Sequence, residues 1–375
     1  MRMMFAGGGT AGHVNPIIAI AKAAINMRPD TEVMFVGCVG GIEQKLVAAE
    51  GFDIETFEMR GFKRSMSPAA ILYNLNVLKN AGAAERKASE IIRRFKPDVV
   101  LGSGGYASYP AVRAAQRLGI KTAVLEVNAL PGIATKTLAK KADRILLAYK
   151  ECVDVFDNKD KCVVTGTPLR MEMLSIDRDE ARVKLGVGSR PLVVSFWGSI
   201  GGKFVNEMTA SLIALESTDH SYKHIHATGS AGYKWMPELI ASKGVNLENC
   251  PHIELREYIY DMPVVMAAAD IVMCRGGSTL AEIAAMGKPS IIVPSPYVAE
   301  NHQEKNAMVF KDKRAAEVIL ESECSGELMY NTIRRMLADK QRMDDMAYRA
   351  ALLAKPDATA KICEILFSLP QSDKK

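Results

Sequence analysis

Short apolar runs alternate along the chain with glycine-rich loops and with longer segments of helical period. The apolar runs occur at 1–6, 33–36, 99–101, 122–125, 191–197, 271–274 and 290–293. A repeated order of strand, loop and helix is typical of an α/β fold, in which helices cover both faces of a doubly wound parallel sheet. The pattern starts again near residue 191, so we predict two Rossmann-like domains.

The first glycine loop, residues 7–13, has glycines at 7, 9 and 12, the spacing of a dinucleotide-binding fingerprint. We expect a helix to open after it, with Asn15 as the cap and Pro16 in the first turn. A dinucleotide site also needs an acidic residue at the end of the next strand, but GCVG stands there at 37–40. A nicotinamide dehydrogenase therefore stays an alternative that rests on the fold-level motif alone.

His13 is the residue of this loop whose side chain can exchange a proton near neutral pH. Its ring could hydrogen-bond the loop and hold its shape, which is a structural role. It could also act as a general base, because a neutral imidazole beside a glycine-lined opening can take the proton of an approaching hydroxyl. Spacing alone leaves both interpretations open.

The stretch 270–307 has the pattern of a nucleotide site. Its strand at 271–274 leads through a glycine pair into a small-residue helix that we expect to stop at Gly287. The start of such a helix offers N–H groups and a positive dipole end to a diphosphate. Thr279 and Glu282 have the spacing of a capping box. Glu282 either closes that box or accepts two hydrogen bonds from a ribose.

A charged, glycine-punctuated segment at 177–190 marks the passage to the second unit, where the glycine loop 198–202 follows a strand. The N–H groups of such a loop suit a phosphate. HIHATG at 224–229 alternates in polarity, so we expect a strand with a solvated face and give its histidines no role. An apolar stripe at 362–369 predicts a last helix.

A helix is also expected between 67 and 82, with Ser67 as its cap and apolar residues at 71, 72, 75 and 78 on one face. Such a stripe usually packs into a core. Basic residues at 63, 64 and 79 lie beside it and favour a second interpretation, an interfacial patch on an anionic membrane surface.

Composition and charge exclude several classes of protein. With 375 residues, 48% of them hydrophobic and 24% charged, the chain suits two globular domains. A net charge of +5 without a dense basic face argues against nucleic acid as a partner. No apolar run reaches the roughly 18 to 20 residues of a membrane span, and the first loop starts too early for a signal peptide, so we expect cytosolic synthesis. The seven cysteines lack metal-site spacing, and we expect buried thiols, no metal and no cofactor.

Several motifs resemble those of the MurG family, bacterial transferases that add N-acetylglucosamine from its UDP-sugar to the lipid-linked muramoyl-peptide of peptidoglycan. They are GGGTAGHVNP, GGYASYP, LEVNALPG and CRGGSTLAEIAAMGKPSIIVPSPYVAENHQEKNA. The resemblance covers nearly the whole chain. It implies a GT-B architecture, in which two Rossmann-like domains face a cleft, with domains at 1–165 and 166–345 and a helix within 346–375 that packs back on the first domain.

Carried over residue by residue, the resemblance makes His13 the catalytic base and places Gly104, Tyr106 and Glu126 on the acceptor side. The residues that it assigns to the donor are Thr10, Gly12, Asn128, Arg170, Ser199, Ile259, Glu282 and Gln303. Four positions depart from the family pattern, in which glycine, asparagine, glutamine and alanine are usual: Ala11, Thr167, Ile200 and Gly202.

The resemblance implies inverting transfer of N-acetylglucosamine from UDP-N-acetylglucosamine to the C4 hydroxyl of N-acetylmuramic acid in lipid I, which gives lipid II. The implied partners are UDP-N-acetylglucosamine, lipid I, the anionic cytoplasmic face of the cell membrane and other cell-wall synthesis proteins. Two alternatives stay open. One is a related transferase with another lipid or natural-product acceptor, and the other is a non-catalytic UDP-sugar-binding partner of the cell-wall machinery.

Overall fold

The computed structural model describes residues 1–61, 67–198, 200–298 and 301–371. The chain divides into two compact units. Unit 1 comprises Met1–Arg170 and Lys355–Lys375, and unit 2 comprises Met171–Ala354. The sequence predicts boundaries at 165/166 and 345/346, and the second of these falls inside a helix of unit 2, Lys340–Ala351.

Unit 1 is built on a seven-stranded sheet whose strand pairs are all parallel. From one edge to the other the strands are β3 (Ile54–Phe57), β2 (Glu32–Cys38), β1 (Arg2–Ala6), β4 (Val99–Gly102), β5 (Lys121–Glu126), β6 (Arg144–Leu147) and β7 (Cys162–Val164). Because β1, β4 and β5 are neighbours, the loops that follow them meet at one edge of the sheet.

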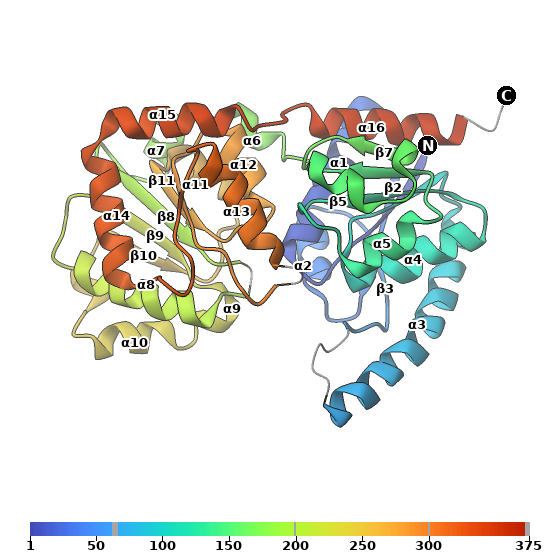
Figure 1. Cartoon of the computed structure of the whole chain (residues 1–375), viewed down its shortest axis with the longest axis horizontal. Helices are drawn as coiled ribbons and strands as arrows, with labels where there is room; N and C mark the ends of the chain where they lie inside the picture. The colour runs from blue at the N-terminus through green and yellow to red at the C-terminus, as the bar shows by residue number, and fades with distance from the viewer. Residues whose placement is uncertain (62–66, 199, 299–300, 372–375) are drawn as a thin grey trace. The chain divides into compact units, whose positions relative to one another are not determined.

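Helices cover both faces of this sheet (Figure 1). Successive residues of β1 therefore face two different buried clusters, one on each side of the sheet. The helices of unit 1 are α1 (Ala11–Met27), α2 (Ile42–Ala49), α3 (Pro68–Phe95), α4 (Gly105–Arg117), α5 (Ile133–Ala139), η1 (Lys150–Val155), η2 (Lys159–Lys161), α16 (Ala358–Ser368) and η5 (Leu369–Gln371). The last helix, α16, packs on α1, where Ile362 and Leu366 share a buried cluster with Val14 and Ile17. The apolar stripe expected at 362–369 is this buried face.

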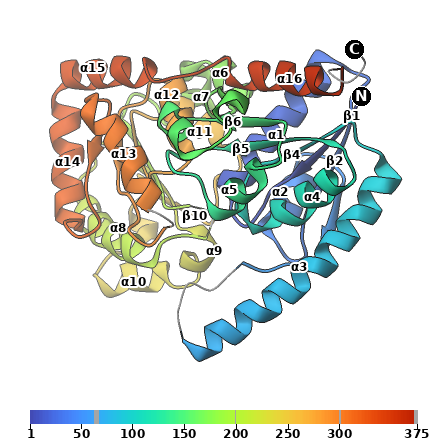
Figure 2. The ribbon, with the colours of Figure 1, turned by 45° about the vertical axis from the view of Figure 1, so that its right-hand side comes forward.

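Helix α3 begins at Pro68, as predicted, and continues to Phe95, past the expected end near 82. Its second half packs against α4 and contributes Ala84 and Ile91 to the core, whereas its first half projects from the sheet (Figure 2). Leu72, a member of the predicted stripe, is 64% exposed. The side chains at 71, 75, 78 and 79, and all of 62–66, lie outside the described residues.

Unit 2 has a six-stranded sheet, again with parallel pairs only. Its strands, edge to edge, are β10 (Ile253–Arg256), β9 (Lys223–Ala227), β8 (Leu192–Phe196), β11 (Ile271–Cys274), β12 (Ser290–Ile292) and β13 (Glu317–Val318). As in unit 1, the first strand along the chain lies inside the sheet, so the loops after β8, β9 and β11 are neighbours.

The helices of unit 2 are α6 (Glu172–Ser175), α7 (Arg178–Lys184), α8 (Lys203–Glu216), α9 (Gly229–Gly232), α10 (Met236–Ser242), η3 (Leu247–Asn249), α11 (Met262–Ala268), α12 (Thr279–Ala285), α13 (His302–Asp312), α14 (Gly326–Ala338) and α15 (Lys340–Ala351). The segment 177–190, predicted as a passage between domains, contains α7 and belongs to unit 2. Asp177 caps that helix by accepting from the N–H groups of Asp179 and Glu180 at 2.8 and 3.0 Å.

All seven cysteines are free thiols, and six of them are buried, as the sequence predicts for most of them. Among the described residues, no three histidine, cysteine or carboxylate side chains converge as a metal site would require. No helix in the described part of the chain has both the length and the apolar character of a membrane span.

Candidate functional site

The first glycine loop joins β1 to α1 and places His13 in the first turn of the helix. Because α1 begins at Ala11, the prediction of Asn15 as its cap is wrong. The first turn forms ahead of Pro16, where the His13 N–H bonds the Thr10 carbonyl at 3.1 Å, and Pro16 lies inside the helix.

The tautomer of His13 follows from its hydrogen bond to the end of β4. Its Nδ1 lies 2.8 Å from the backbone oxygen of Ser103. A carbonyl oxygen can only accept, so in the neutral ring Nδ1 carries the hydrogen and Nε2 carries the lone pair. The Ser103 hydroxyl in turn donates to the His13 carbonyl at 2.6 Å. These two bonds hold the imidazole in the tautomer that a general base needs.

The start of α4 lies against the His13 ring. A Cβ at Gly104, whose φ is +87°, would stand 3.1 Å from His13 Cε1. The Tyr106 ring covers the same loop, since a Cβ at Gly9 would stand 3.0 Å from its Cε1. Burial, first of all, raises the pKa of the Tyr106 hydroxyl, which keeps it a hydrogen-bond donor at neutral pH. The structure thus brings together the predicted base, Gly104 and Tyr106.

Glu126 binds its own loop, although the sequence places it beside the acceptor. One carboxylate oxygen accepts from the backbone N–H and the side-chain amide of Asn128 at 3.1 and 2.9 Å, and the other accepts from Gly132 N at 3.1 Å. Glu126 is only 3% exposed. These three hydrogen bonds to a buried carboxyl group stabilise the loop between β5 and α5 and engage both of its oxygens within that loop.

Glu43, in the first turn of α2, is the residue of this region that sequence reasoning missed. It is 1% exposed, and its two carboxylate oxygens accept from Gly9 N at 3.1 Å and from Cys38 N at 2.8 Å. A Cβ at any of three surrounding glycines would collide with the carboxylate: Gly8, Gly37 and Gly41. The signal in the sequence was the group of glycines in GCVGG, at 37–41, shortly before Glu43, because glycines leave room for a side chain that packs against the backbone. Glu43 fixes the shape of the first glycine loop.

The second glycine loop, 198–202, joins β8 to α8 in unit 2. Ser199 lies outside the described residues. Gly198 and Gly201 have φ of +90° and +83°, and a Cβ on Gly201 would collide with the backbone oxygen of Thr228. The loop leads directly into the 14-residue helix α8, whose first N–H groups and positive dipole end suit a phosphate.

Arg275 brings a fixed positive charge to the same loop, and sequence reasoning missed it. A Cβ at Gly202, where alanine is usual, would stand 2.8 Å from its guanidinium. The guanidinium also donates to the Val293 carbonyl at 3.0 Å and pairs with Glu321 at 2.6 Å. These contacts hold Arg275 between the loop 198–202 and the end of β11.

The predicted capping box of α12 is wrong. Ser278 is the cap residue, and it already has helical dihedral angles, so its side chain makes no capping hydrogen bond and Thr279 is the first helical residue. The helix ends at Gly287 in the left-handed conformation, as predicted. Glu282 is half-buried, and its charge adds to burial in raising the pKa of the Cys274 thiol, which places it near the end of β11. The capping interpretation of Glu282 is therefore wrong, and binding of the ribose stays a prediction.

Helix α13 sets Gln303 beside the loop after β11. A Cβ at Gly276 would collide with the Gln303 backbone, and Asn306 Nδ2 donates to the Gly276 carbonyl at 2.9 Å. The side-chain oxygen of Gln303 accepts from Ser295 N at 2.9 Å. The amide of Gln303 is therefore fixed in orientation, with its carbonyl end on the backbone.

The other residues assigned to the donor are divided between the units. Thr10 is exposed at the cap of α1, Gly12 lies in the first turn of that helix, and half-buried Arg170 is the last residue of the first segment of unit 1. Ile259 belongs to unit 2 and packs into its core, so any nucleobase contact there must use the backbone.

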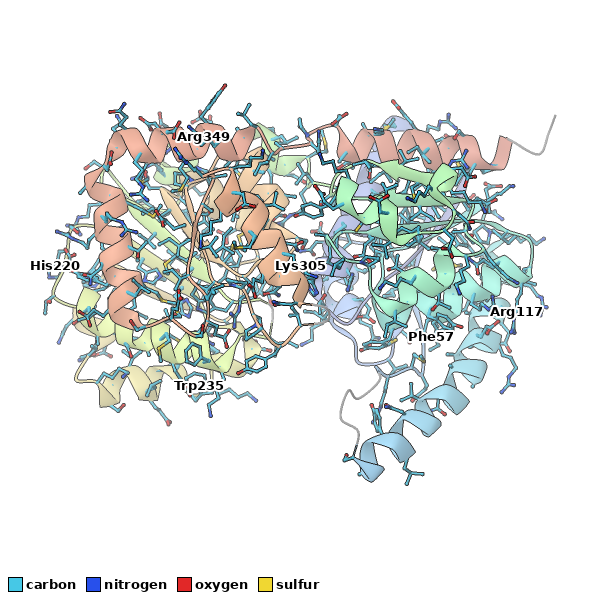
Figure 3. All side chains as sticks on the ribbon, in the orientation of Figure 1. Phe57, Arg117, His220, Trp235, Lys305 and Arg349 are labelled. Carbon is cyan, nitrogen blue, oxygen red and sulfur yellow. The ribbon has the colours of Figure 1, made fainter. Side chains whose placement is uncertain are left out.

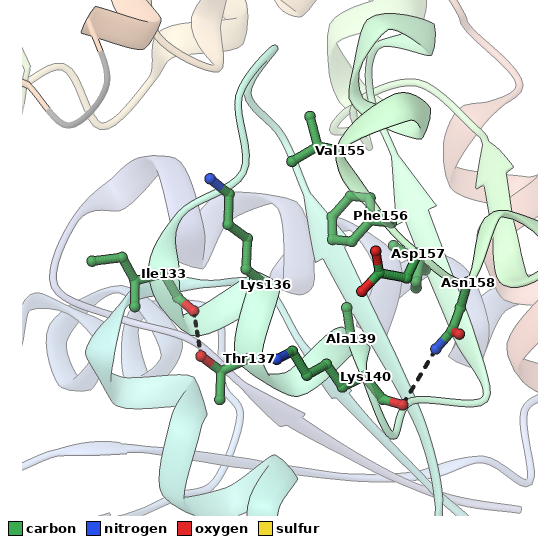
Figure 4. Close-up of a pocket in the computed structure, with 10 residues that line it drawn as sticks. Ile133, Lys136, Thr137, Ala139, Lys140, Val155, Phe156, Asp157 and Asn158 are labelled. Atoms are coloured by element: carbon green, nitrogen blue, oxygen red, sulfur yellow. Dashed lines mark hydrogen bonds between the residues drawn. The ribbon is translucent and has the colours of Figure 1, made fainter.

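A cavity of about 310 Å³ lies between α5 and the segment 155–158 of unit 1 (Figure 4). Apolar side chains and two lysines of α5, Lys136 and Lys140, line it. None of the predicted site residues is among its lining, and Asn158 closes one side through a hydrogen bond to the Lys140 carbonyl at 3.3 Å. The cavity is therefore separate from the His13 region.

The expectation that HIHATG has a solvated face is also wrong. His224 and His226 on β9 are 1% and 0% exposed. In a parallel sheet covered on both faces, an alternating strand is buried on both sides, so its polar residues need internal partners. The nearby His252 donates from Nε2 to the Glu216 backbone carbonyl at 3.0 Å. Its Nδ1 lies 3.2 Å from Nδ1 of the exposed His220, which is labelled in Figure 3.

Comparison with known proteins adds to this geometry. The models of the glycosyltransferase family 28 N-terminal and C-terminal domains match residues 3–147 and 192–362. The UDP-N-acetylglucosamine–N-acetylmuramyl-(pentapeptide) pyrophosphoryl-undecaprenol N-acetylglucosamine transferase of Acetivibrio thermocellus is 41% identical over 98% of this chain and 97% of its own. The transferase of the same name from Caldanaerobacter subterraneus is 38% identical over 98% and 99%.

The chain belongs to the MurG family within glycosyltransferase family 28. The crystal structure of MurG from Acinetobacter baumannii matches it with a TM-score of 0.67 at 25% identity, covering 98% of this chain and 99% of that one. A UDP-GlcNAc 2-epimerase from Neisseria meningitidis has a TM-score of 0.67 at 12% identity over 98% and 100%, which shows a shared fold only. As a member of the MurG family the chain is a glycosyltransferase with the two-domain, Rossmann-like GT-B architecture that its sequence predicts.

Proposed function

We propose that this chain transfers N-acetylglucosamine from UDP-N-acetylglucosamine to the C4 hydroxyl of N-acetylmuramic acid in lipid I, which gives lipid II. Relatives named for this activity match it over 98% of its length. The structural observation that carries the proposal is the bond from His13 Nδ1 to the Ser103 carbonyl at 2.8 Å. It leaves Nε2 as a proton acceptor beside the glycines of two adjoining loops.

In the proposed reaction the C4 oxygen attacks the anomeric carbon of the donor sugar from the side opposite UDP. The C4–O–H proton passes to Nε2 of His13, and the bond between the anomeric carbon and the phosphate oxygen breaks. Its electron pair leaves with UDP, so the configuration of the anomeric carbon is inverted. The Tyr106 hydroxyl and the backbone at Gly104 are the groups of unit 1 that orient the acceptor.

The donor is assigned mainly to unit 2. The N–H groups of the loop 198–202 and of the α8 N-terminus bind the diphosphate, and Arg275 adds a positive charge that stabilises departing UDP. Glu282 accepts from the ribose hydroxyls, Gln303 contacts the sugar, and the backbone near Ile259 contacts uracil.

A lipid-linked acceptor also requires contact with a membrane, and we assign this contact to the first half of α3 in unit 1. Leu72 is 64% exposed there, and basic residues are frequent along residues 63–96. Exposed apolar side chains beside lysine and arginine bind an anionic surface. Attachment on the cytoplasmic side of the membrane, next to the cell-wall synthesis proteins, follows from the nature of the two substrates.

The test is turnover of UDP-N-acetylglucosamine with a lipid I analogue, compared in parallel with diacylglycerol. We expect product with the lipid I analogue only. Product with diacylglycerol alone would assign the chain to another lipid acceptor. Binding of UDP without product from either acceptor would assign it to the non-catalytic class.

A further inference from the structure

A continuous chain of hydrogen bonds crosses the interior of unit 2 and ends beneath the second glycine loop. Each of its side chains is 0 to 1% exposed. At the far end, Tyr222 Oη lies 2.7 Å from Glu216 Oε1, and Glu216 Oε2 lies 2.7 Å from His224 Nδ1. In the middle, Ser195 Oγ lies 2.7 Å from His224 Nε2 and 2.6 Å from His226 Nδ1. At the loop end, His226 Nε2 lies 3.2 Å from Asn206 Oδ1, and Asn206 Nδ2 lies 2.7 Å from the Thr228 carbonyl oxygen.

The direction of donation along this chain is fixed from the loop end. The Thr228 carbonyl can only accept, so the Asn206 amide must turn its N–H₂ toward it and its oxygen toward His226. His226 then donates from Nε2 and accepts at Nδ1, which requires the Ser195 hydroxyl to donate to it. Burial, and then the charge of His224, lower the pKa of His226, in keeping with a neutral ring.

The same logic fixes the opposite end. Because the hydroxyl proton of Ser195 is used on His226, its oxygen must accept from His224 Nε2. His224 Nδ1 faces Glu216, whose other carboxylate oxygen accepts from Tyr222. His224 thus donates from Nε2 to Ser195, and its Nδ1 is held on the buried Glu216 carboxyl group. Every bond between His224 and Thr228 therefore has a single direction of donation, and the contact with Glu216 anchors its far end.

The loop end of the chain has little freedom. Gly229, with φ of +75°, packs against Gly201 so closely that a Cβ on either glycine would collide with the other backbone segment. Asn206 also donates its backbone N–H to the Gly202 carbonyl at 3.0 Å. The positions of Gly201 and Gly202 thus depend on where Thr228 and Asn206 are held.

We propose that Ser195, His224 and His226 are positioning residues for the donor diphosphate. They orient Asn206, and Asn206 holds the Thr228 turn against the glycine loop so that the loop N–H groups converge on the phosphate. The inference rests on the proposed function, since it takes the loop 198–202 as the diphosphate site. A fully satisfied buried network specifies one conformation, whereas an apolar core of the same volume would give comparable stability without that specification.

The test compares two variants that each remove one buried hydroxyl. Ser195→Ala interrupts the chain between its two histidines, whereas Tyr222→Phe removes a bond at the far end and leaves the orientation from His224 to Thr228 intact. UDP affinity is measured by titration calorimetry, Tm by thermal melting, and KM and kcat with UDP-N-acetylglucosamine and a lipid I analogue. Full-length protein is used throughout.

We expect Ser195→Ala to raise the Kd for UDP and the donor KM about tenfold, since a loosened network costs about one charge-assisted hydrogen bond, while kcat changes less than twofold. Tyr222→Phe should lower Tm to a similar extent and leave the Kd unchanged. Should Ser195→Ala fail to fold, His224→Gln, which replaces the imidazole with a neutral amide, is expected to weaken the binding of UDP in the same way. Equal Kd values in all variants would overturn the inference alone. Absence of UDP binding to the wild-type protein would overturn the proposed function as well.

Discussion

The two glycine loops follow the first strands of two similar sheets, yet opposite charges surround them. In unit 1 the buried carboxylate of Glu43 accepts the Gly9 N–H at 3.1 Å. In unit 2 a side-chain amide, Asn206, supports the loop from below, and the Arg275 guanidinium lies beside Gly202. A diphosphate at the first loop would face the Glu43 carboxylate, whereas at the second loop it would share the Arg275 guanidinium with Glu321. Glycine spacing alone therefore does not define a phosphate loop, because the charge beneath the glycines decides which ligand they accept.

This difference also accounts for the apparent dinucleotide fingerprint at 7–13. Its Gly9 N–H, which would bind a pyrophosphate in a dinucleotide enzyme, is already bonded to Glu43. That N–H is engaged and His13 is held on Ser103, as the proposed transfer of a proton at the first loop requires. The nicotinamide dehydrogenase alternative thus loses the feature that suggested it.

The largest effect is expected from His13→Ala. A positioned general base contributes about 10² to 10⁴ in rate, so kcat should fall by at least about 10²-fold. The affinity for UDP should stay unchanged, because the base acts in the transition state and on the other loop. Steady-state kinetics with a lipid I analogue, alongside calorimetry with UDP, provides both numbers. If kcat falls by less than tenfold, His13 has only the structural role of holding its loop.

A second large effect is expected from Glu282→Ala on donor affinity. Loss of two hydrogen bonds to an ionised carboxylate, at about 1.5 kcal/mol each, should raise the Kd for UDP about a hundredfold. Loss of a helix cap makes no contribution to the change in Tm, because Thr279 is not the cap residue of α12. The decisive control is UDP without its ribose hydroxyls. The wild-type protein should bind that analogue about as weakly as Glu282→Ala binds UDP. If Glu282→Ala still prefers UDP over the analogue to the same extent as wild type, the ribose contact is ruled out.

Glu43→Gln sharpens the comparison of the loops. Glutamine has the shape of glutamate, but its amide N–H₂ must face the N–H of either Gly9 or Cys38, so the first loop should shift. We expect kcat to fall about tenfold, which corresponds to about 1.4 kcal/mol, with UDP affinity unchanged. Gln44→Ala is the matched control, because Gln44 makes an exposed hydrogen bond to Gly40 N at 2.6 Å from the same turn. Equal kinetics in the two variants would argue against a special role for Glu43.

The smallest effect is expected from the membrane contact. Leu72→Glu should weaken binding to anionic vesicles about fivefold, since one apolar contact is lost and one repulsive charge near the surface costs about 1 kcal/mol. Its Tm should not move, because Leu72 is 64% exposed. Val77→Glu, at a position 3% exposed in the same helix, should instead destabilise the fold by several kcal/mol. Vesicle co-sedimentation beside thermal melting separates the two changes, and equal sedimentation of wild type and Leu72→Glu would place the membrane contact elsewhere.

Sequence reasoning worked where a local pattern determines structure. The strand 271–274 and the stop at Gly287 are found where predicted, because an apolar run and a left-handed glycine are local signals. Helix starts were harder to predict. Pro16 suggested Asn15 as one cap and Thr279 was predicted as another, but the preceding glycines let the chain enter the helix earlier, so that the helices begin at Ala11 and Thr279.

What sequence reasoning missed depends on contacts between distant residues. Glu43 looks like an ordinary residue of an amphipathic helix until Gly9, 34 positions earlier, is found on its carboxylate. His224 and His226 look like the polar face of an edge strand until both faces of the sheet are covered and Ser195 lies between them. Buried polar groups take their meaning from partners that only the fold supplies.

The most direct test of the division of labour between the loops is rescue of His13→Ala by added imidazole. A lost base can be replaced by a soluble one, whereas a misplaced loop cannot. We predict that imidazole raises the kcat of His13→Ala in a concentration-dependent way, by at least about tenfold, and leaves Glu43→Gln and wild type unchanged. Equal stimulation of both variants, or a His13→Ala enzyme that transfers sugar at nearly the wild-type rate without imidazole, would contradict proton transfer by His13 at the first loop.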